Sequence, residues 1–279
     1  EDDFNQQLTL LYSESLSILS NYITSFDELD PSTWTDRLPK GLLLNNIPCL
    51  VSPFSGLWSN PPSNKFNIRG QGYLSDKVKV LSDSPLFHLR GIQIFRTQTF
   101  HNNIANQSWS GYPKHKHNNQ WLILNYMIPG TFKVQIICYF TATQESLEVL
   151  KKDANQITIG WQLLLKKFWE GDKSFCDSRF KLIPHVVEGP WPIKMAVGQT
   201  PALTGKKLVQ SYHKGSGYLE IGIDIHSSSA ATRILKMVRF QCKSIVVDLG
   251  ITIQGEDPSE LPERVLCQCR YNKVDFNNA

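Results

Sequence analysis

Four acidic side chains next to apolar segments are candidates for acid–base chemistry: Asp172, Glu188, Glu220 and Asp224. A carboxyl group in an apolar pocket can act as a general acid or base. No nucleophile accompanies them, because the sequence has no G-x-S-x-G, H-E-x-x-H, P-loop or dinucleotide fingerprint. We therefore expect no enzymatic activity. Ion pairs with Lys or Arg of a neighbouring strand are the default role of Glu220 and Asp224, and a catalytic carboxylate pair is the alternative.

Residue types that bind metals occur in two places. His115 and His117 are two residues apart in a polar loop over residues 100–119, but no Asp, Glu or Cys lies nearby to complete a ligand shell. Cys267 and Cys269 form a C-x-C pair, whereas structural zinc sites usually use C-x-x-C pairs. We expect no metal site, a solvated basic loop and packed thiols. The six cysteines permit disulfides without showing them.

Basic residues with regular spacing are candidates for contact with anions. Arg179 and Lys181 are two residues apart where a helical pattern changes to a strand pattern. Arg233, Lys236 and Arg239 follow at i, i+3 and i+6, so they share one face of a predicted helix. A solvated face is the simple interpretation, and contact with phosphate or membrane headgroups is the functional one. The net charge of +4 is too small to indicate a nucleic-acid partner.

Composition bounds the class of protein. The chain has 279 residues, which suits one large domain or two small ones with a sizeable core. Hydrophobic residues make up 41% and charged residues 19%, which favours a well-packed globule or one with an apolar cavity. No run of eighteen apolar residues exists, so we expect no membrane-spanning helix. The chain starts without Met and has one sequon at Asn106, which leaves secretion open as an alternative.

A joint between helix and sheet over residues 168–188 must position many of these side chains. A broad apolar stripe predicts helix over residues 144–171, either continuous or divided near residue 157. Turn residues at 129–131 between two apolar runs predict a hairpin over residues 120–143. The remaining expectations are helices over residues 1–30, 230–240 and 258–266, a connector over 40–64, and strands over 65–81, 86–99, 180–187, 193–197, 218–225, 244–254 and the end of the chain.

Several ordered motifs resemble a known family, the C-terminal domain of the plant Enhanced Disease Resistance Two proteins. The resemblance covers roughly residues 57–272 and implies a lipid-associated protein, because this domain follows membrane-binding and START lipid-transfer modules in those proteins. It also implies a cytoplasmic or membrane-peripheral location. The motifs are LWSNPPSNKFNIRGQGYLSDKVKV (57–80), ILNYMIPG (123–130), FWEGDKSFCDSRFKLIPHVVEGPW (168–191), VGQTPALTGKKL (197–208), GYLEIGIDIHSSSAA (217–231) and VVDLGITIQGEDPSELPERVL (246–266).

These observations predict one α+β domain, over residues 57–279, in which a curved antiparallel sheet packs around long helices in a helix-grip-like manner. Residues 1–56 add a helix and connector on its outside. We expect non-enzymatic binding or carriage of a lipid, sterol or carotenoid-like pigment in an internal apolar cavity. A peripheral membrane or protein-docking module with a solid core is the alternative. A homo-oligomer is left open. The predicted ligand contacts are Trp121, Tyr126, Trp161, Phe168 and Trp191, and the predicted headgroup contacts are Arg69, Lys79, Arg179, Lys181, Lys194, Arg233, Lys236 and Arg239.

Overall fold

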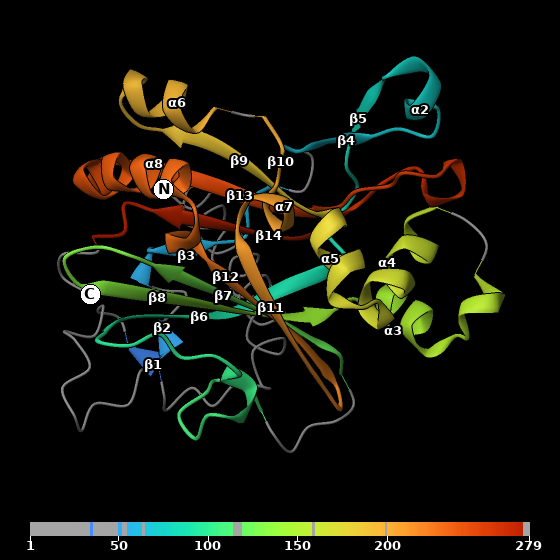
Figure 1. Ribbon diagram of the computed structural model, residues 1–279, viewed down its shortest axis with the longest axis horizontal. Coiled ribbons are helices and arrows are strands. Elements are labelled where there is room, and N and C mark those ends of the chain that lie inside the picture. Colours follow the sequence, from blue (N-terminus) through green and yellow to red (C-terminus); the bar gives the residue numbers. More distant parts are fainter. Residues whose placement is uncertain are drawn as a thin grey trace, which may run out of the picture.

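Two β-sheets form the centre of the molecule (Figure 1). The computed structural model describes residues 34–35, 50–51, 55–62, 65–113, 119–157, 160–198 and 200–275. The larger sheet has seven strands in the order β1-β2-β6-β8-β7-β12-β11, and only the β1–β2 and β7–β12 pairs are parallel. Its strands are β1 (Trp34–Thr35), β2 (Leu50–Val51), β6 (Phe87–Thr97), β7 (Trp121–Ile128), β8 (Lys133–Ala142), β11 (Val209–Gly215) and β12 (Tyr218–Asp224).

The smaller sheet has five strands in the order β10-β9-β13-β14-β3, and every neighbouring pair is antiparallel. A separate two-stranded hairpin, β4–β5, projects from the same half of the molecule and is joined by a short helix (Figure 1). These elements are β3 (Trp58–Ser59), β4 (Asn67–Arg69), α2 (Tyr73–Asp76), β5 (Lys79–Leu81), β9 (Phe180–Glu188), β10 (Ala202–Leu203), β13 (Val246–Ile253) and β14 (Val265–Asn272).

Three helices cover one end of the two sheets (Figure 1). α3 (Gln144–Lys151) and α4 (Gly160–Glu170) replace the single long helix that the apolar stripe allowed, which agrees with the β-branched residues between them. α5 (Lys173–Arg179) follows, with the Asp172 carboxylate accepting the backbone N–H of Phe175 as an N-terminal cap. β9 begins directly at Phe180, so the predicted joint between helix and sheet is confirmed.

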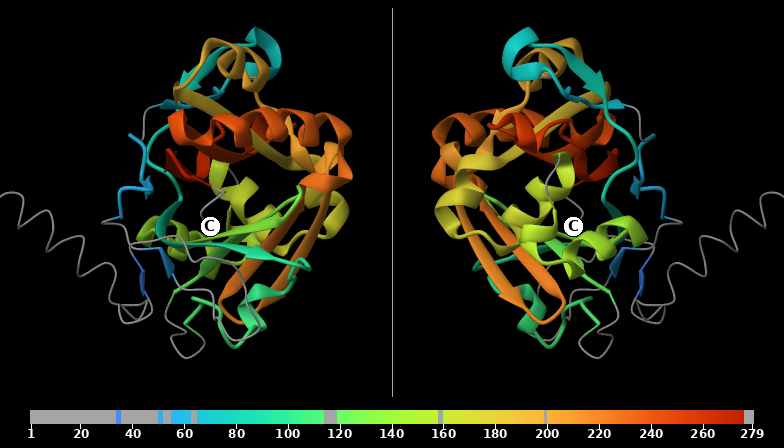
Figure 2. Two further views of the ribbon diagram at one scale, coloured as in Figure 1. Left: turned by 90° about the vertical axis from the view of Figure 1, so that its left-hand side faces the viewer. Right: turned by 90° about the vertical axis from the view of Figure 1, so that its right-hand side faces the viewer.

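Two further helices lie beside the smaller sheet. α8 (Ser229–Gln241) runs along the edge of the space between the sheets, and α6 (Trp191–Val197) follows β9 on the outer side (Figures 1 and 2). The prediction of a strand over residues 193–197 is therefore wrong. Pro192 in the first turn favours a helix start, and Gly198, with φ of 65°, ends the helix.

The other predicted elements can be compared directly. The hairpin of residues 120–143 is confirmed as β7 and β8, two central strands that are almost completely buried. The expected strands in 218–225 and 244–254 are present, as is the helix in 230–240. The 258–266 segment contains only a short 3-10 helix, η8 (Pro258–Glu260), before β14. The helix predicted for residues 1–30 lies outside the described residues.

The α+β class is confirmed, and the sheet is divided into two. The inner face of the larger sheet faces the smaller sheet and shares one hydrophobic core with it. Its outer face is covered by the segment after β6, which places Ile104 and Tyr112 against the buried Trp121 and Tyr139. The short connecting elements of this cover and of the sheet ends are η4 (Ile104–Asn106), η5 (Ala154–Gln156), α7 (Thr204–Lys207), η6 (Ile225–Ser227) and η7 (Cys242–Ser244).

Candidate functional site

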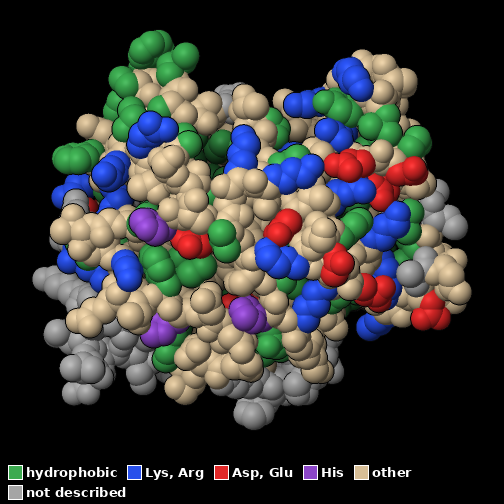
Figure 3. Space-filling view, viewed as in Figure 1, with side chains coloured by type: hydrophobic (Ala, Val, Ile, Leu, Met, Phe, Trp, Pro, Cys, Tyr) green, Lys and Arg blue, Asp and Glu red, His purple; other side chains and the backbone are tan. Residues whose placement is uncertain are grey.

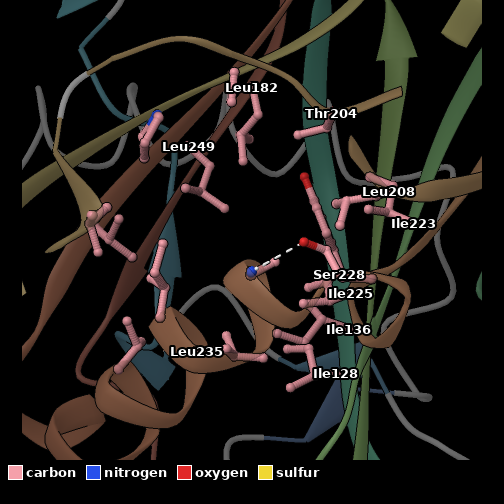
Figure 4. Close-up of a pocket in the computed structure, with 18 of the residues that line it drawn as sticks. Ile128, Ile136, Leu182, Thr204, Leu208, Ile223, Ile225, Ser228, Leu235 and Leu249 are labelled. Carbon is pink, nitrogen blue, oxygen red and sulfur yellow. Dashed lines mark hydrogen bonds between the residues drawn. The ribbon is translucent and has the colours of Figure 1, made fainter. Parts of the chain in front are cut away.

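A cavity of about 400 Å³ lies between the two sheets, with α8 as one wall (Figure 4). In the close-up, Leu182 and Leu249 reach into it from the smaller sheet, Ile136 and Ile223 from the larger sheet, and Leu235 from α8. The volume falls in the range of small-molecule sites, which is about 300–1,000 Å³. The cavity is therefore a candidate site for a small molecule.

The periodicity of each element explains why its side chains reach the cavity. In β7, Tyr126 and Ile128 are two residues apart and point to the inner face, as alternate residues of a strand do. In α8, the lining residues recur at helical spacing and form a single stripe. The apolar lining consists of Ile128, Ile136, Phe180, Leu182, Pro184, Val197, Ala202, Leu208, Ile223, Ile225, Ala230, Ala231, Ile234, Leu235, Val238, Ile245, Val247, Leu249 and Val274.

Two buried tyrosines and three thiols add a weakly polar cluster. Tyr126 and Tyr271 line the cavity, and the Tyr271 hydroxyl lies 3.0 Å from the Cys138 Sγ. Burial raises the pKa of both tyrosines well above the ordinary value of 10.0, with a further increase from the nearby thiols. Burial likewise raises the pKa of the Cys267 and Cys269 thiols well above their ordinary value. The two tyrosines therefore stay neutral at physiological pH and offer hydroxyl groups without charge.

The rim of the cavity carries the remaining polar groups. Ser228 is the N-terminal cap of α8, with its Oγ accepting the backbone N–H of Ala231 (Figure 4). Thr204 is buried, and its hydroxyl accepts a hydrogen bond from Gln210. Lys207, which is exposed, is the single charged side chain among the described lining residues. Charge is thus confined to the rim, while the interior is apolar.

The predicted ligand contacts are distributed over the molecule. Tyr126 lines the cavity, whereas Trp121, five positions earlier in the same strand, faces the opposite side of the sheet and packs against Tyr112. Phe168 is buried in the adjoining core, with its ring 6.2 Å from that of the cavity residue Phe180. The two remaining tryptophans do not line the cavity: Trp161 lies under the Arg264 guanidinium, and Trp191 is 72% exposed on α6.

Three predicted headgroup contacts meet instead around two buried glutamates. Lys181 donates to both oxygens of Glu263, at 2.9 and 2.8 Å, and Arg69 approaches the same carboxylate at 3.7 Å. Arg179 donates to Glu260 at 2.8 Å. These cations have carboxylate partners within the chain, so a role in headgroup binding stays a prediction.

The other predicted headgroup contacts lie apart from this cluster. Lys79 is exposed on the β4–β5 hairpin, and Lys194 approaches the backbone carbonyl of Val187 at 3.4 Å. On α8, Arg233 and Lys236 are exposed. Arg239 is different, because it donates to two carbonyl oxygens of the β7–β8 turn, those of Pro129 (2.9 Å) and Phe132 (3.3 Å).

The acidic candidates have local structural partners. Glu220 is buried and accepts the backbone N–H of Ala105 at 3.1 Å, which differs from the expected ion pair with a neighbouring strand. Asp224 accepts the backbone N–H of His226, and Glu188 pairs with Lys273 at 3.1 Å.

Within the described ranges, no group of three or more His, Cys, Asp or Glu side chains could hold a metal ion. His115 and His117 lie outside those ranges. The described cysteines are free thiols: Cys138, Cys176, Cys242, Cys267 and Cys269.

Most residues that line the cavity were not predicted as ligand contacts, although the sequence of α8 contains a pattern that indicates an apolar face. Its apolar residues recur at positions 231, 234, 235 and 238, which is the spacing of one helical face. The predictions for this helix concerned only its basic residues, so no role was predicted for its apolar face. Ile223 lies in the strand predicted over residues 218–225, but the sequence gives no sign that this strand borders a cavity.

Comparison with known proteins places the chain in a family. The family model described as "Protein ENHANCED DISEASE RESISTANCE 2, C-terminal" matches residues 58–275. These residues contain the whole cavity lining and both sheets, except for strands β1 and β2 of the larger sheet. The chain belongs to this family. In this chain, the Enhanced Disease Resistance 2 C-terminal region has the two-sheet arrangement described above.

A relative of the same family gives a second comparison. The Arabidopsis thaliana protein named "Protein ENHANCED DISEASE RESISTANCE 2-like" is 29% identical over 223 residues. The match covers 80% of this chain but only 29% of that protein, so the chain spans less than a third of its relative. No solved structure matches the chain. In the described residues, no helix is long and apolar enough to cross a membrane.

Proposed function

We propose that this domain binds and carries a hydrophobic small molecule, such as a lipid, a sterol or a carotenoid-like pigment, in the cavity between its sheets. The observation that carries the proposal is the cavity itself, about 400 Å³ in volume and lined almost entirely by aliphatic and aromatic side chains. Removing apolar surface of a ligand from water gains about 25 cal/mol per Å². Such a cavity favours a carrier over a docking module with a solid core.

The polar groups favour a neutral ligand. The interior has the hydroxyls of Tyr126 and Tyr271, whose pKa values are raised by burial, and no described carboxylate, guanidinium or imidazole lines it. A charged group would lose its hydration in the interior without gaining a partner, which costs several kcal/mol. A hydroxyl or carbonyl at one end of an otherwise apolar ligand suits this lining. If the ligand has a charged headgroup, we place that group at the rim near Lys207.

We propose no enzymatic activity for this site. A hydrolase or transferase would need a nucleophile with its base, or a general acid and base, within reach of the bound molecule. The described lining offers none of these pairs, and burial raises the pKa of the Tyr126 hydroxyl and of the Cys269 thiol, which keeps both groups neutral.

A variant that fills the cavity tests the proposal. Ala231 lines the cavity from α8, and Ala231→Phe adds a ring to that space. After incubation of each protein with a mixture of phospholipid, sterol and carotenoid, bound molecules are extracted and quantified. We expect the variant to retain much less than the natural chain. Glu148→Phe, on the exposed face of α3, adds the same ring outside the cavity and should bind as the natural chain does. Equal retention by all three proteins would contradict the proposal.

A further inference from the structure

Two neighbouring helices expose large apolar side chains to solvent. On α6, Trp191 is 72% exposed and Met195 is 63% exposed. On α8, Met237 is 43% exposed and Phe240 is 91% exposed. Single exposed apolar residues are common on protein surfaces, but a contiguous group of large ones indicates an interaction site.

The two helices form one continuous surface. Ile193 and Val197 of α6 pack in the same small core as Val238 of α8, together with Ile245. α6 and α8 lie next to each other at the same end of the molecule (Figures 1 and 2). We define the α6–α8 surface as the exposed side chains Trp191, Lys194, Met195, Arg233, Lys236, Met237 and Phe240.

The charge of this surface has one sign. α6 and α8 contain Lys194, Arg233, Lys236 and Arg239 and no Asp or Glu. Lys and Arg side chains alternate with hydrophobic ones over both helices in the upper left of Figure 3. Among the described residues, Arg233 and Lys236 have no carboxylate partner.

The acidic residues nearest to the two helices along the chain, Glu188 and Asp224, already have partners, and the Asp224 carboxylate accepts the backbone N–H of His226 at 2.9 Å. Glu188, just before α6, pairs with Lys273 at 3.1 Å, and Asp275 pairs with Lys243, just after α8, at 2.9 Å. These two pairs leave the positive charge of the helices uncompensated. An anionic partner is therefore favoured over a neutral surface, and over a second copy of these helices, which carry the same positive charge.

We propose that the α6–α8 surface docks on a lipid bilayer that contains anionic lipids. Trp and Phe at the level of the headgroups, with Lys and Arg beside them, are the combination found on helices that lie in the membrane interface. The exposed side chains suit both the acyl-chain boundary and the phosphate layer of such an interface. Trp191 and Phe240 enter the boundary of the acyl chains, and Arg233 and Lys236 contact the phosphates. This docking does not depend on a ligand in the cavity.

The docking also has a consequence for the cavity. The inner side of α8 lines it through Ala231, Leu235 and Val238, and the end of α6 lines it through Val197. One helix thus separates the cavity from the proposed bilayer. If the domain carries a hydrophobic molecule, docking places this helical wall of the cavity against the membrane; this second statement rests on the proposed function.

Vesicle sedimentation tests the docking. The full chain is mixed with phosphatidylcholine vesicles, with or without phosphatidylserine. We expect binding to the anionic vesicles and little binding to the neutral ones. Each basic residue near an anionic surface contributes about a factor of five in affinity, so Arg233→Glu with Lys236→Glu should weaken binding at least about 30-fold. Trp191→Ser with Phe240→Ser should abolish most of the remaining interfacial binding.

Matched controls lie elsewhere on the molecule. Lys151→Glu with Lys152→Glu reverses two exposed charges at the end of α3, and Val78→Ser with Leu81→Ser removes two apolar side chains that are 53% and 57% exposed on the β4–β5 hairpin. Circular dichroism melts confirm that each variant is folded. Controls that lose as much binding as the α6–α8 variants, or equal binding to neutral and anionic vesicles, would overturn the proposal. So would a dimer in solution that the Trp191→Ser, Phe240→Ser variant converts to a monomer, since the partner would then be a second copy.

Discussion

Arg179 shows how a side chain of headgroup-binding type is used within the fold. It donates to the Gln254 carbonyl and to the Glu260 carboxylate, at 2.9 and 2.8 Å, and its guanidinium lies over the Phe175 ring. These contacts join the last turn of α5 to the chain that leaves β13. Charged hydrogen bonds of this kind each contribute about 1.5–3 kcal/mol. At the scale of the residue, Arg179 therefore fixes the joint between helix and sheet.

Arg179→Ala tests this role. We expect the free energy of unfolding to fall by about 2–3 kcal/mol, because the variant leaves the buried Glu260 without one of its cations. Denaturant unfolding measures the change. Arg233→Ala, which removes an exposed arginine, should change stability by less than about 0.5 kcal/mol. An unchanged melting temperature together with lost ligand binding would show that Arg179 contacts the ligand instead.

Glu260 gives a prediction of pH dependence. Burial alone would raise its pKa, but the backbone N–H of Glu256 and the cations Lys167 and Arg179 outweigh burial, so the pKa lies below the ordinary value of 4.5. A carboxylate whose pKa is lowered by folding stabilises the native state above its unfolded pKa, and this stabilisation is lost as the pH falls through the folded pKa.

The comparison with Glu260→Gln isolates that contribution. We expect the natural chain to exceed the variant in free energy of unfolding at neutral pH, and the difference to shrink progressively below pH 4.5. Urea unfolding at a series of pH values measures it. A difference that is independent of pH would mean that the ionised form of Glu260 is not the stabilising one.

At the scale of the element, strong periodic patterns could be predicted and short ones could not. β7 and β8 were recognised because both runs are long and the turn residues between them are unambiguous. The pattern of residues 193–197 predicts a strand as readily as the observed helix α6, because Ile193 and Val197 fit either period over so few residues. Pro192 in the first turn was the signal that could have decided it.

α8 is the element whose stability should depend on the cavity. None of its residues is fully buried, and its inner face borders empty space as well as packed side chains. Elements with few buried contacts open more readily than core strands. We expect the amides of α8 to exchange with deuterium faster than those of β8, which is almost completely buried. Exchange measured by mass spectrometry compares the two segments, and equal protection would show that α8 is part of the rigid core.

At the scale of the whole molecule, the sequence indicated the α+β class and an apolar cavity, but not where that cavity lies or which residues line it. The lining combines residues of β7, β8 and β12 with residues of β9, β13, β14 and α8, which are far apart in the chain. Whether such apolar faces meet or leave a space depends on the curvature and separation of two sheets. No local pattern encodes that separation, since a residue facing a cavity and one facing a packed core have the same apolar character.

The same limit applies to the grouping of site residues. The sequence offered Trp121 and Tyr126 as parts of one site, but an odd number of positions along a strand separates them, so they occupy opposite faces of the sheet. Side chains alternate between the two faces of a strand, so their spacing in the sequence could have assigned Trp121 and Tyr126 to different faces. The meeting of Arg69, Arg179 and Lys181 around Glu260 and Glu263, by contrast, required the three-dimensional fold.

Native mass spectrometry of the protein from its own source tests the central claim, that the domain carries a hydrophobic molecule, most directly. We expect a complex heavier than the chain alone, from which organic solvent extracts one apolar compound per chain. A visible absorption band would identify that compound as a pigment. The Ala231→Phe variant should be found without it. A protein that is isolated at the calculated mass of the chain, and that takes up nothing from the lipid mixture, would contradict the claim that the domain carries a hydrophobic molecule.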